Sequence, residues 1–123
     1  MIWPKVAEWI SAALAHGGGG YTIEDIYEAL LCRGMSLWLI GGDTLKACAV
    51  TRLCTQPRLN LCELIAVGGE DVASWEHLIV NLEEWAKSVG CQEMRPYGRL
   101  GWKVHAKRYG YEPLCVVYRK RLQ

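Results

Sequence analysis

The chain has 123 residues, 51% of them apolar, and its 14 basic and 13 acidic side chains leave a formal net charge of +1. A chain of this size and composition can bury a hydrophobic core, which excludes intrinsic disorder, and we expect one domain over residues 1–123. No apolar run approaches the roughly eighteen residues that cross a bilayer, and the N-terminus lacks the features of a signal peptide. We therefore expect a protein of the cytoplasm without a membrane partner.

The near-zero charge is the sum of two unlike parts of the chain. Residues 1–94 carry six basic and twelve acidic side chains, whereas residues 95–123 carry eight basic and one acidic side chain. Such an asymmetry indicates an anionic partner for the C-terminal part, although it says nothing about the fold.

The six cysteines and three histidines show no metal-binding spacing. No Cys-x-x-Cys pair occurs, and the histidines lie far apart in the sequence. Five of the cysteines fall in or beside runs of Leu, Ile, Val and Ala, where a thiol behaves as a small apolar side chain. We therefore expect free, buried thiols and no metal site.

Two helices are predicted at the N-terminus. Pro4 stands at a first-turn position, and apolar residues recur after it at helical spacing as far as Leu14. After four consecutive glycines, Thr22 and Asp25 have the spacing of a capping box, which begins a second helix that runs to about Arg33.

Three extended segments follow the helices. Ser36–Ile40 and Thr44–Thr55 flank Gly41-Gly42-Asp43, which predicts a hairpin. A second turn leads into Leu59–Val67, where both faces are apolar, so this strand is expected at the centre of the sheet.

The rest of the chain alternates helices and strands. The predicted elements are a long helix, a short strand, a further helix and a final strand, over residues 71–90, Cys91–Tyr97, Arg99–Tyr109 and Leu114–Arg121. A strand, helix, strand unit implies that Leu59–Val67 and Cys91–Tyr97 lie parallel, joined by a right-handed crossover. The predicted fold is α+β: two N-terminal helices, an antiparallel meander, a central parallel strand pair with its crossover helix, then a helix and a final strand.

This order of elements resembles the GNAT superfamily of N-acetyltransferases over nearly the whole chain. The segment Ala106–Glu112, before a final strand, is similar to the ending of that family. Gly98–Trp102 leading to Tyr109–Tyr111 is similar to small GNAT-like proteins of tailed bacteriophages, some of them carried in virions. The resemblance implies a GNAT-like fold and a location in the cytoplasm of a host cell or in a virion.

In the GNAT family, acetyl-CoA lies where the two parallel strands splay apart. Its pyrophosphate binds the backbone amides at the start of the following helix, where free N–H groups and the helix dipole attract anions. The resemblance carries this cofactor site onto Val67, Gly68, Gly69 and Ser74. The family's loop has an Arg or Gln ahead of its glycines, and this sequence has none at that spacing. It has instead Glu70 and Asp71, which suit a helix N-terminus as dipole partners.

Two catalytic positions of the family can be placed on this sequence. The general acid is often a Tyr four residues before the Gly of the ending, and Ala106 stands there. Tyr109 lies three residues, or about 300°, further round the helix and does not substitute for it. The general base of some members is a Glu on the strand before the cofactor loop, which corresponds to Glu63. A base at this position requires that burial between Cys62 and Leu64 desolvates the carboxylate and raises its pKa. More often such a residue pairs with a neighbouring Arg or reaches solvent at a sheet edge, so a functional role for Glu63 is the minority interpretation.

Basic side chains gather on the predicted C-terminal helix. They are Arg99, Lys103 and Lys107 in one stripe, with Arg95 and Arg108 beside it. No acid lies between Arg95 and Tyr111 to pair with them. Such a patch suits cofactor phosphates, nucleic acid, or an acidic protein surface such as that of another copy. Trp3 at the N-terminus and Trp102 among the basic residues are candidate interface anchors.

Three functions follow from these observations. The leading one is a phage-type GNAT-like protein with a binding or structural role, in a virion or outside it, with lost or reduced catalysis and no cofactor; its partners are proteins or other copies of itself. The alternative is an active acetyl-CoA-dependent N-acyltransferase that uses Glu63 as base and a phosphate site on Arg99 and Lys103. The third is nonspecific nucleic-acid binding through the basic helix.

Overall fold

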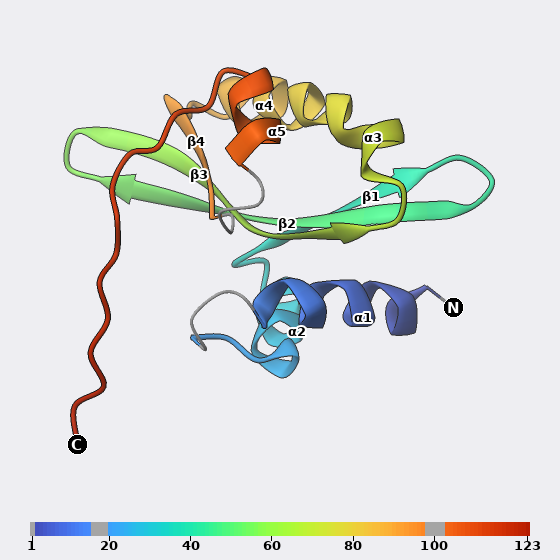
Figure 1. The fold of residues 1–123 in the computed structure, drawn as a ribbon, viewed down its shortest axis with the longest axis horizontal. Helices are drawn as coiled ribbons and strands as arrows, with labels where there is room; N and C mark the ends of the chain where they lie inside the picture. The colour runs from blue at the N-terminus through green and yellow to red at the C-terminus, as the bar shows by residue number, and fades with distance from the viewer. Residues whose placement is uncertain (1, 16–19, 98–102) are drawn as a thin grey trace.

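The computed structural model describes residues 2–15, 20–97 and 103–123. Its elements, in chain order, are α1 (Trp3–Leu14), α2 (Ile23–Leu31), β1 (Ser36–Gly41), β2 (Leu45–Gln56), β3 (Leu59–Gly69), α3 (Val72–Trp75), the 3-10 turn η1 (Glu76–Leu78), α4 (Ile79–Ser88), β4 (Glu93–Pro96) and α5 (Lys103–Arg108). The sheet forms the middle layer, with α1 and α2 on one face and α3, α4 and α5 on the other (Figure 1). No helix in the described part of the chain is long and apolar enough to cross a membrane.

The sheet has the order β1-β2-β3-β4. The first three strands form an antiparallel meander, and β3 and β4 are parallel. The crossover between them carries α3 and α4, as the strand, helix, strand pattern predicts. The α+β fold class with a central parallel pair is therefore confirmed.

Apolar side chains fill both sides of the sheet. The larger cluster lies between the sheet and the two N-terminal helices and includes Val6, Trp9, Ile10, Ile26, Met35, Cys48, Val50 and Ala66. The smaller one lies under α4 and includes Ala49, Leu64 and Leu82. Each large apolar side chain buried in this way contributes roughly 1.5–3 kcal/mol. The predicted capping box of α2 is present: Thr22 accepts a hydrogen bond from the Asp25 amide, and Asp25 accepts one from the Thr22 amide.

Strand β3 continues well beyond its pairing with β4. The pairs with β4 run only from Leu61 with Glu93 to Leu64 with Pro96, whereas β3 extends to Gly69. At the same point the register with β2 slips, because Val50 pairs with Ala66 and Thr51 with Leu64, which leaves Ile65 as the extra residue of a bulge. Within the described residues, β3 therefore has no strand beside it on the β4 edge after the bulge.

The long helix predicted after Asp71 is interrupted. Asp71 has a left-handed backbone (φ 52°), and Trp75 leaves the helical region (φ −131°), so α3, η1 and α4 follow one another as separate pieces. The Trp75 indole Nε1 donates to the Glu70 carbonyl at 2.7 Å, which ties the first turn back to the loop before it. Apolar periodicity could not show this break, because the interrupted helix keeps its apolar side toward the sheet.

The C-terminal strand predicted over Leu114–Arg121 is absent from the structure. Residues 111–123 have no regular secondary structure and lead away from the sheet, past its α1 and α2 side (Figure 1). The composition favours a strand, but a strand also needs a neighbour for its backbone hydrogen bonds, and the described part of the chain supplies none here. The preceding helix, predicted over Arg99–Tyr109, is described from Lys103 to Arg108.

All six cysteines are free thiols. Cys48 and Cys62 are buried, and burial raises the pKa of each to about 11, so both remain protonated and unreactive at neutral pH. Cys32 and Cys115 are exposed, which makes the expectation of burial wrong for these two.

Gly68 shows how closely the helical layer packs on the sheet. A Cβ at this position would lie 2.8 Å from both the Cβ and the carbonyl oxygen of Trp9 on α1. We predict that Gly68→Ala lowers the free energy of unfolding by about 1–3 kcal/mol, since α1 must move away to make room. Denaturant unfolding measures this loss. Gly42→Ala is the matched control, because nothing lies within 4 Å of the position that its methyl group would take; an equal loss in both variants would contradict the packing explanation.

Candidate functional site

Glu63 lies in the middle of β3, with Arg52 of β2 opposite it on one side and Arg95 of β4 on the other. It is 7% exposed. Its side chain points to the face covered by α1 and α2, because the Arg52 guanidinium beside it also reaches Tyr21, in the connection between those helices. The sheet thus holds a carboxylate where the resemblance expects a general base.

Three side chains bond this carboxylate, and a fourth, Tyr21, bonds one of the three. We call the five residues the Glu63 cluster: Tyr21, Arg52, Cys54, Glu63 and Tyr97. Arg52 donates from Nε to Oε1 at 2.8 Å and also from its second terminal nitrogen. Cys54 Sγ donates to the same oxygen at 2.9 Å, and the Tyr97 hydroxyl donates to Oε2. Arg52 further donates to the Tyr21 hydroxyl at 2.6 Å. Both oxygens of Glu63 are therefore already engaged.

The surroundings of Glu63 decide its protonation. Burial raises the pKa of Glu63, but the hydrogen bonds from Cys54, Tyr97 and Arg52 together outweigh burial and leave the pKa below its ordinary value. The bond to Glu63 raises the pKa of Tyr97 to about 12. The interpretation of Glu63 as a base with a raised pKa is thus wrong, and the more usual outcome, a pair with a neighbouring Arg, is what the structure contains. A carboxylate this acidic and this fully bonded is a weak base.

The loop after β3 is where the resemblance places a cofactor pyrophosphate. Two of its amides are engaged internally: Glu70 N donates to the Lys46 carbonyl at 2.9 Å, and Ser74 N donates to the Asp71 carbonyl at 3.0 Å. The Ser74 hydroxyl donates to the same carbonyl at 2.8 Å. Glu70 itself forms an exposed ion pair with Lys5 of α1 at 3.1 Å.

These residues do not fit a pyrophosphate. The loop presents the carboxylates of Glu70 and Asp71. Lys5 of α1 lies beside the loop, but its charge is paired with Glu70. Close packing explains the two glycines of the loop. A Cβ at Gly68 would clash with Trp9, and a Cβ at Gly69 would lie 2.5 Å from atoms of β2. The loop therefore presents negative charge where a bound diphosphate needs positive charge, and packing explains its glycines.

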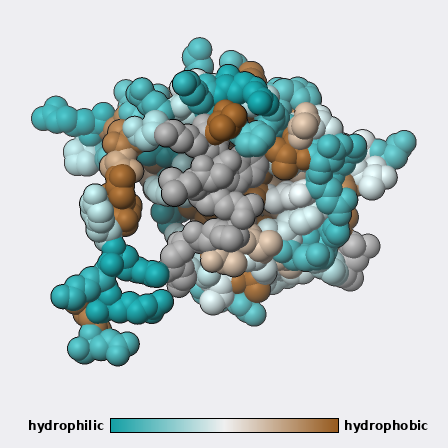
Figure 2. Space-filling model, viewed as in Figure 1, coloured by the Kyte–Doolittle hydropathy of each residue, from teal (hydrophilic) through white to brown (hydrophobic). Residues whose placement is uncertain are grey.

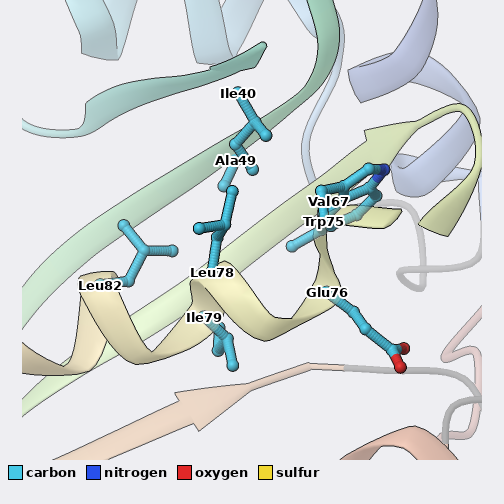
Figure 3. Close-up of a pocket in the computed structure, with 8 residues that line it drawn as sticks. All are labelled: Ile40, Ala49, Val67, Trp75, Glu76, Leu78, Ile79 and Leu82. Atoms are coloured by element: carbon cyan, nitrogen blue, oxygen red, sulfur yellow. The ribbon is translucent and has the colours of Figure 1, made fainter. Parts of the chain in front are cut away.

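A second buried carboxylate joins the crossover to α5. Glu76 in η1 is 9% exposed and pairs with Arg108, while the His105 Nδ1 lies 2.6 Å from its other oxygen. Figure 3 shows Glu76 at the rim of a small apolar cavity, with its carboxylate turned away from the apolar side chains. That cavity, between η1, α4 and the sheet, measures about 30 Å³, which is space for a water-sized group only.

The other predicted site residues are scattered. Arg95 pairs with Glu93 at 2.9 Å, and Arg108 pairs with Glu76. The expectation that these two basic residues are unpaired is therefore wrong. The acid for Arg95 precedes it on β4, and the acid for Arg108 lies far back in the chain, in η1. Lys107 is exposed. Arg99, Trp102 and the side chain of Lys103 lie outside the described residues. Trp3 is half-buried, with its ring 5.0 Å from that of Tyr27, and its use as an interface anchor stays a prediction.

Solved structures resemble this fold over nearly its whole length. An acetyltransferase from Trypanosoma brucei matches with a TM-score of 0.67 at 12% identity, over 94% of this chain and 89% of the other. Glucosamine-6-phosphate N-acetyltransferase from Arabidopsis thaliana matches with 0.66 at 15% identity, over 100% and 95%. Ribosomal-protein-alanine N-acetyltransferase from Brucella melitensis biovar Abortus 2308 matches with 0.65 at 14% identity, over 96% and 94%.

Neither the known protein-family models nor the functionally curated proteins give a match to this sequence. Identities this low show the fold alone. The chain has the fold of the GNAT N-acetyltransferases, and the resemblance inferred from the order of its elements is confirmed to that extent.

Sequence reasoning missed four of the five members of the Glu63 cluster. Arg52 could have been found, because counting back along both strands from the turn at residues 56–59 places it opposite Glu63. Cys54 follows from the strand alternation once Arg52 is known. No local pattern indicates Tyr21 or Tyr97, which are 42 and 34 residues from Glu63 in the chain.

We predict that Glu63→Gln lowers the free energy of unfolding by about 1–3 kcal/mol, because it removes the charge from a nearly buried hydrogen-bonded pair whose Arg52 partner keeps some contact with water. Glu93→Gln is the matched control. The Glu93 side chain is 46% exposed in its pair with Arg95, so the substitution should cost less than about 0.5 kcal/mol. Equal effects of the two substitutions in denaturant unfolding would refute a structural role for the Glu63 cluster.

The same pair predicts a pH dependence. Because the folded-state pKa of Glu63 lies below its unfolded value, its contribution is complete above the ordinary glutamate pKa of about 4.3 and is lost as the pH falls through the lower, folded-state pKa. The difference in stability between the unsubstituted protein and Glu63→Gln should therefore be constant near neutral pH and shrink in acid. Unfolding curves recorded from neutral to acidic pH measure it; a difference that grows in acid has the wrong sign.

Proposed function

We propose that this GNAT-fold protein binds other proteins, itself included, and does not transfer acetyl groups. The observation that carries the proposal is the Glu63 cluster: the one acid at the position of the family's base is held as a low-pKa carboxylate by Arg52, Tyr97 and Cys54. An amine acceptor reaches its reactive form by giving up a proton, and this carboxylate has neither the basicity nor a spare oxygen to take it.

Two further features support the proposal. The loop after β3 carries Glu70 and Asp71 where the cofactor would need positive charge. Ala106 on α5 occupies the position of the family's general acid, so no side chain there can protonate a departing thiolate. The resemblance to phage proteins suggests a virion or the host cytoplasm as the setting, and this stays a prediction.

Calorimetric titration with acetyl-CoA tests the proposal. We expect no saturable heat at millimolar acetyl-CoA, and no release of free thiol when a panel of primary amines is added, because the loop repels the diphosphate. A known GNAT acetyltransferase in the same buffer is the positive control. Micromolar binding accompanied by turnover on any amine would overturn the proposal.

An acetyl-CoA-dependent N-acyltransferase is the second candidate, and the end of the β3–β4 pairing favours it. Beyond Leu64 the described residues place no strand beside β3 on its β4 side, and the family seats its cofactor where its two parallel strands separate. If turnover is found, Glu63→Gln discriminates further: unchanged turnover removes Glu63 as its base. No specific observation favours nonspecific nucleic-acid binding. Two of the basic residues that it would use, Arg95 and Arg108, form ion pairs within the chain.

A further inference from the structure

Helix α2 presents to solvent a face that mixes carboxylates with large apolar side chains. Glu24, Tyr27, Glu28 and Leu31 are three or four residues apart, so they lie along the same side of the helix. All four are exposed, Tyr27 at 46% and Leu31 at 65%. The Tyr27 ring lies 5.0 Å from that of Trp3 on α1, which helps to hold it in place. We call the four residues of α2 the α2 face.

The α2 face is negatively charged. Its helix carries three acids and no base. Asp25 belongs to the capping box, whereas Glu24 and Glu28 form no ion pair with any residue that the structure describes. The one base of the neighbouring helix α1, Lys5, is paired with Glu70 instead. A partner that fits this face therefore combines positive charge with exposed apolar side chains.

Helix α5 has a face of the opposite charge. Val104 and Lys107 are three residues apart and both exposed, Val104 at 68%. Lys107 forms no ion pair within the described residues, and Arg108 beside it keeps 55% side-chain exposure in its pair with Glu76. We call Val104, Lys107 and Arg108 the α5 face. Figure 2 shows mostly hydrophilic side chains gathered over the α4 and α5 side of the molecule, with small apolar spots between them.

The two faces cannot meet within one copy. Helix α2 lies on one side of the sheet, and α5 lies on the other (Figure 1). Each face combines exposed apolar side chains with charge, and the two charges have opposite sign, which is the complementarity that gives a contact its specificity. Because the same chain carries both halves, a second copy is the partner that fits each of them.

We propose that copies of this protein associate head to tail, with the α5 face of one copy resting on the α2 face of the next. Such a contact is heterologous, because it uses different surfaces of the two copies and leaves one face of each kind free at the ends. Assembly therefore continues past two copies. The inference deepens the proposed binding role and rests on it, with a second copy of this chain as the partner.

Sedimentation equilibrium on the full chain, from low micromolar to near-millimolar protein, tests the association. We expect the average mass at low salt to rise from the 13.9 kDa of one chain to more than twice that value. It should fall again in about 1 M salt, where exposed charges are screened beyond about 3 Å. A mass of one chain at every concentration overturns the inference, and so does a mass that stops at two chains.

Charge reversal tests each face separately. Glu24→Lys with Glu28→Lys is the α2-face variant, and Lys107→Glu is the α5-face variant. Each should need at least tenfold more protein to assemble. Asp43→Lys with Glu84→Lys is the matched control for the first variant, because it changes the net charge equally and its acids are exposed in the β1–β2 turn and on α4. Assembly that is unchanged in either face variant, or lost in the control, overturns the inference.

A mixture of the two face variants completes the test. The α2-face variant keeps an unaltered α5 face, and the α5-face variant keeps an unaltered α2 face, so these two surfaces fit each other. An equimolar mixture should reach at least twice the mass of one chain at concentrations where each variant alone remains single. A mixture that stays at one chain overturns the inference. Acetyl-CoA turnover by the assembled protein would overturn the proposed function and leave the head-to-tail contact standing, so the two failures are distinguishable.

Discussion

The buried carboxylate of Glu63 is the constraint on which this end of the molecule depends. A carboxylate in the central strand of a sheet is tolerated only if its oxygens are satisfied. Three donors do so here, two of them from β2 and the third from the chain after β4. Arg52 connects Glu63 to β2 and, through its hydrogen bond to Tyr21, to the segment between the two N-terminal helices. Tyr97 connects Glu63 to the chain just after β4. One ionised group thereby joins the meander, the helical layer and the parallel strand.

The same constraint supports the proposed loss of catalysis. The fold matches solved acetyltransferase structures over almost the whole chain, but Glu63, the residue that the resemblance places at the base position, is engaged in structural hydrogen bonds. The charge of the loop after β3 also supports the proposed loss of catalysis, because Glu70 and Asp71 lie where the resemblance places the negatively charged pyrophosphate of a cofactor. The net charge of +1 hides this arrangement. Three of the eight basic residues after residue 94 lie at the C-terminus, in Arg119–Arg121, and Arg95 and Arg108 are paired with Glu93 and Glu76.

The sequence was sufficient for the elements whose stabilisation is local or periodic. The capping box of α2, the meander and the parallel pair all follow from spacing and alternation. It was insufficient where the outcome depends on contacts between distant residues. The bulge at Ile65, the break at Trp75 and the absent final strand are set by register, by one indole hydrogen bond and by the lack of a neighbouring strand. Glu63 illustrates the difference: its burial was predictable, but the sign of its pKa shift depends on Arg52 and Tyr97.

If Glu63 is a structural carboxylate that stays ionised near neutral pH, its own titration shows this most directly. Carbon NMR of the side-chain carboxyl groups, assigned by comparison with Glu63→Gln, would follow its protonation as the pH is lowered. We expect a midpoint below that of an ordinary glutamate, with the Tyr97 ring resonances shifting in the same step. A midpoint near neutral pH would contradict it, since a carboxyl group that titrates there is poised to act as a base.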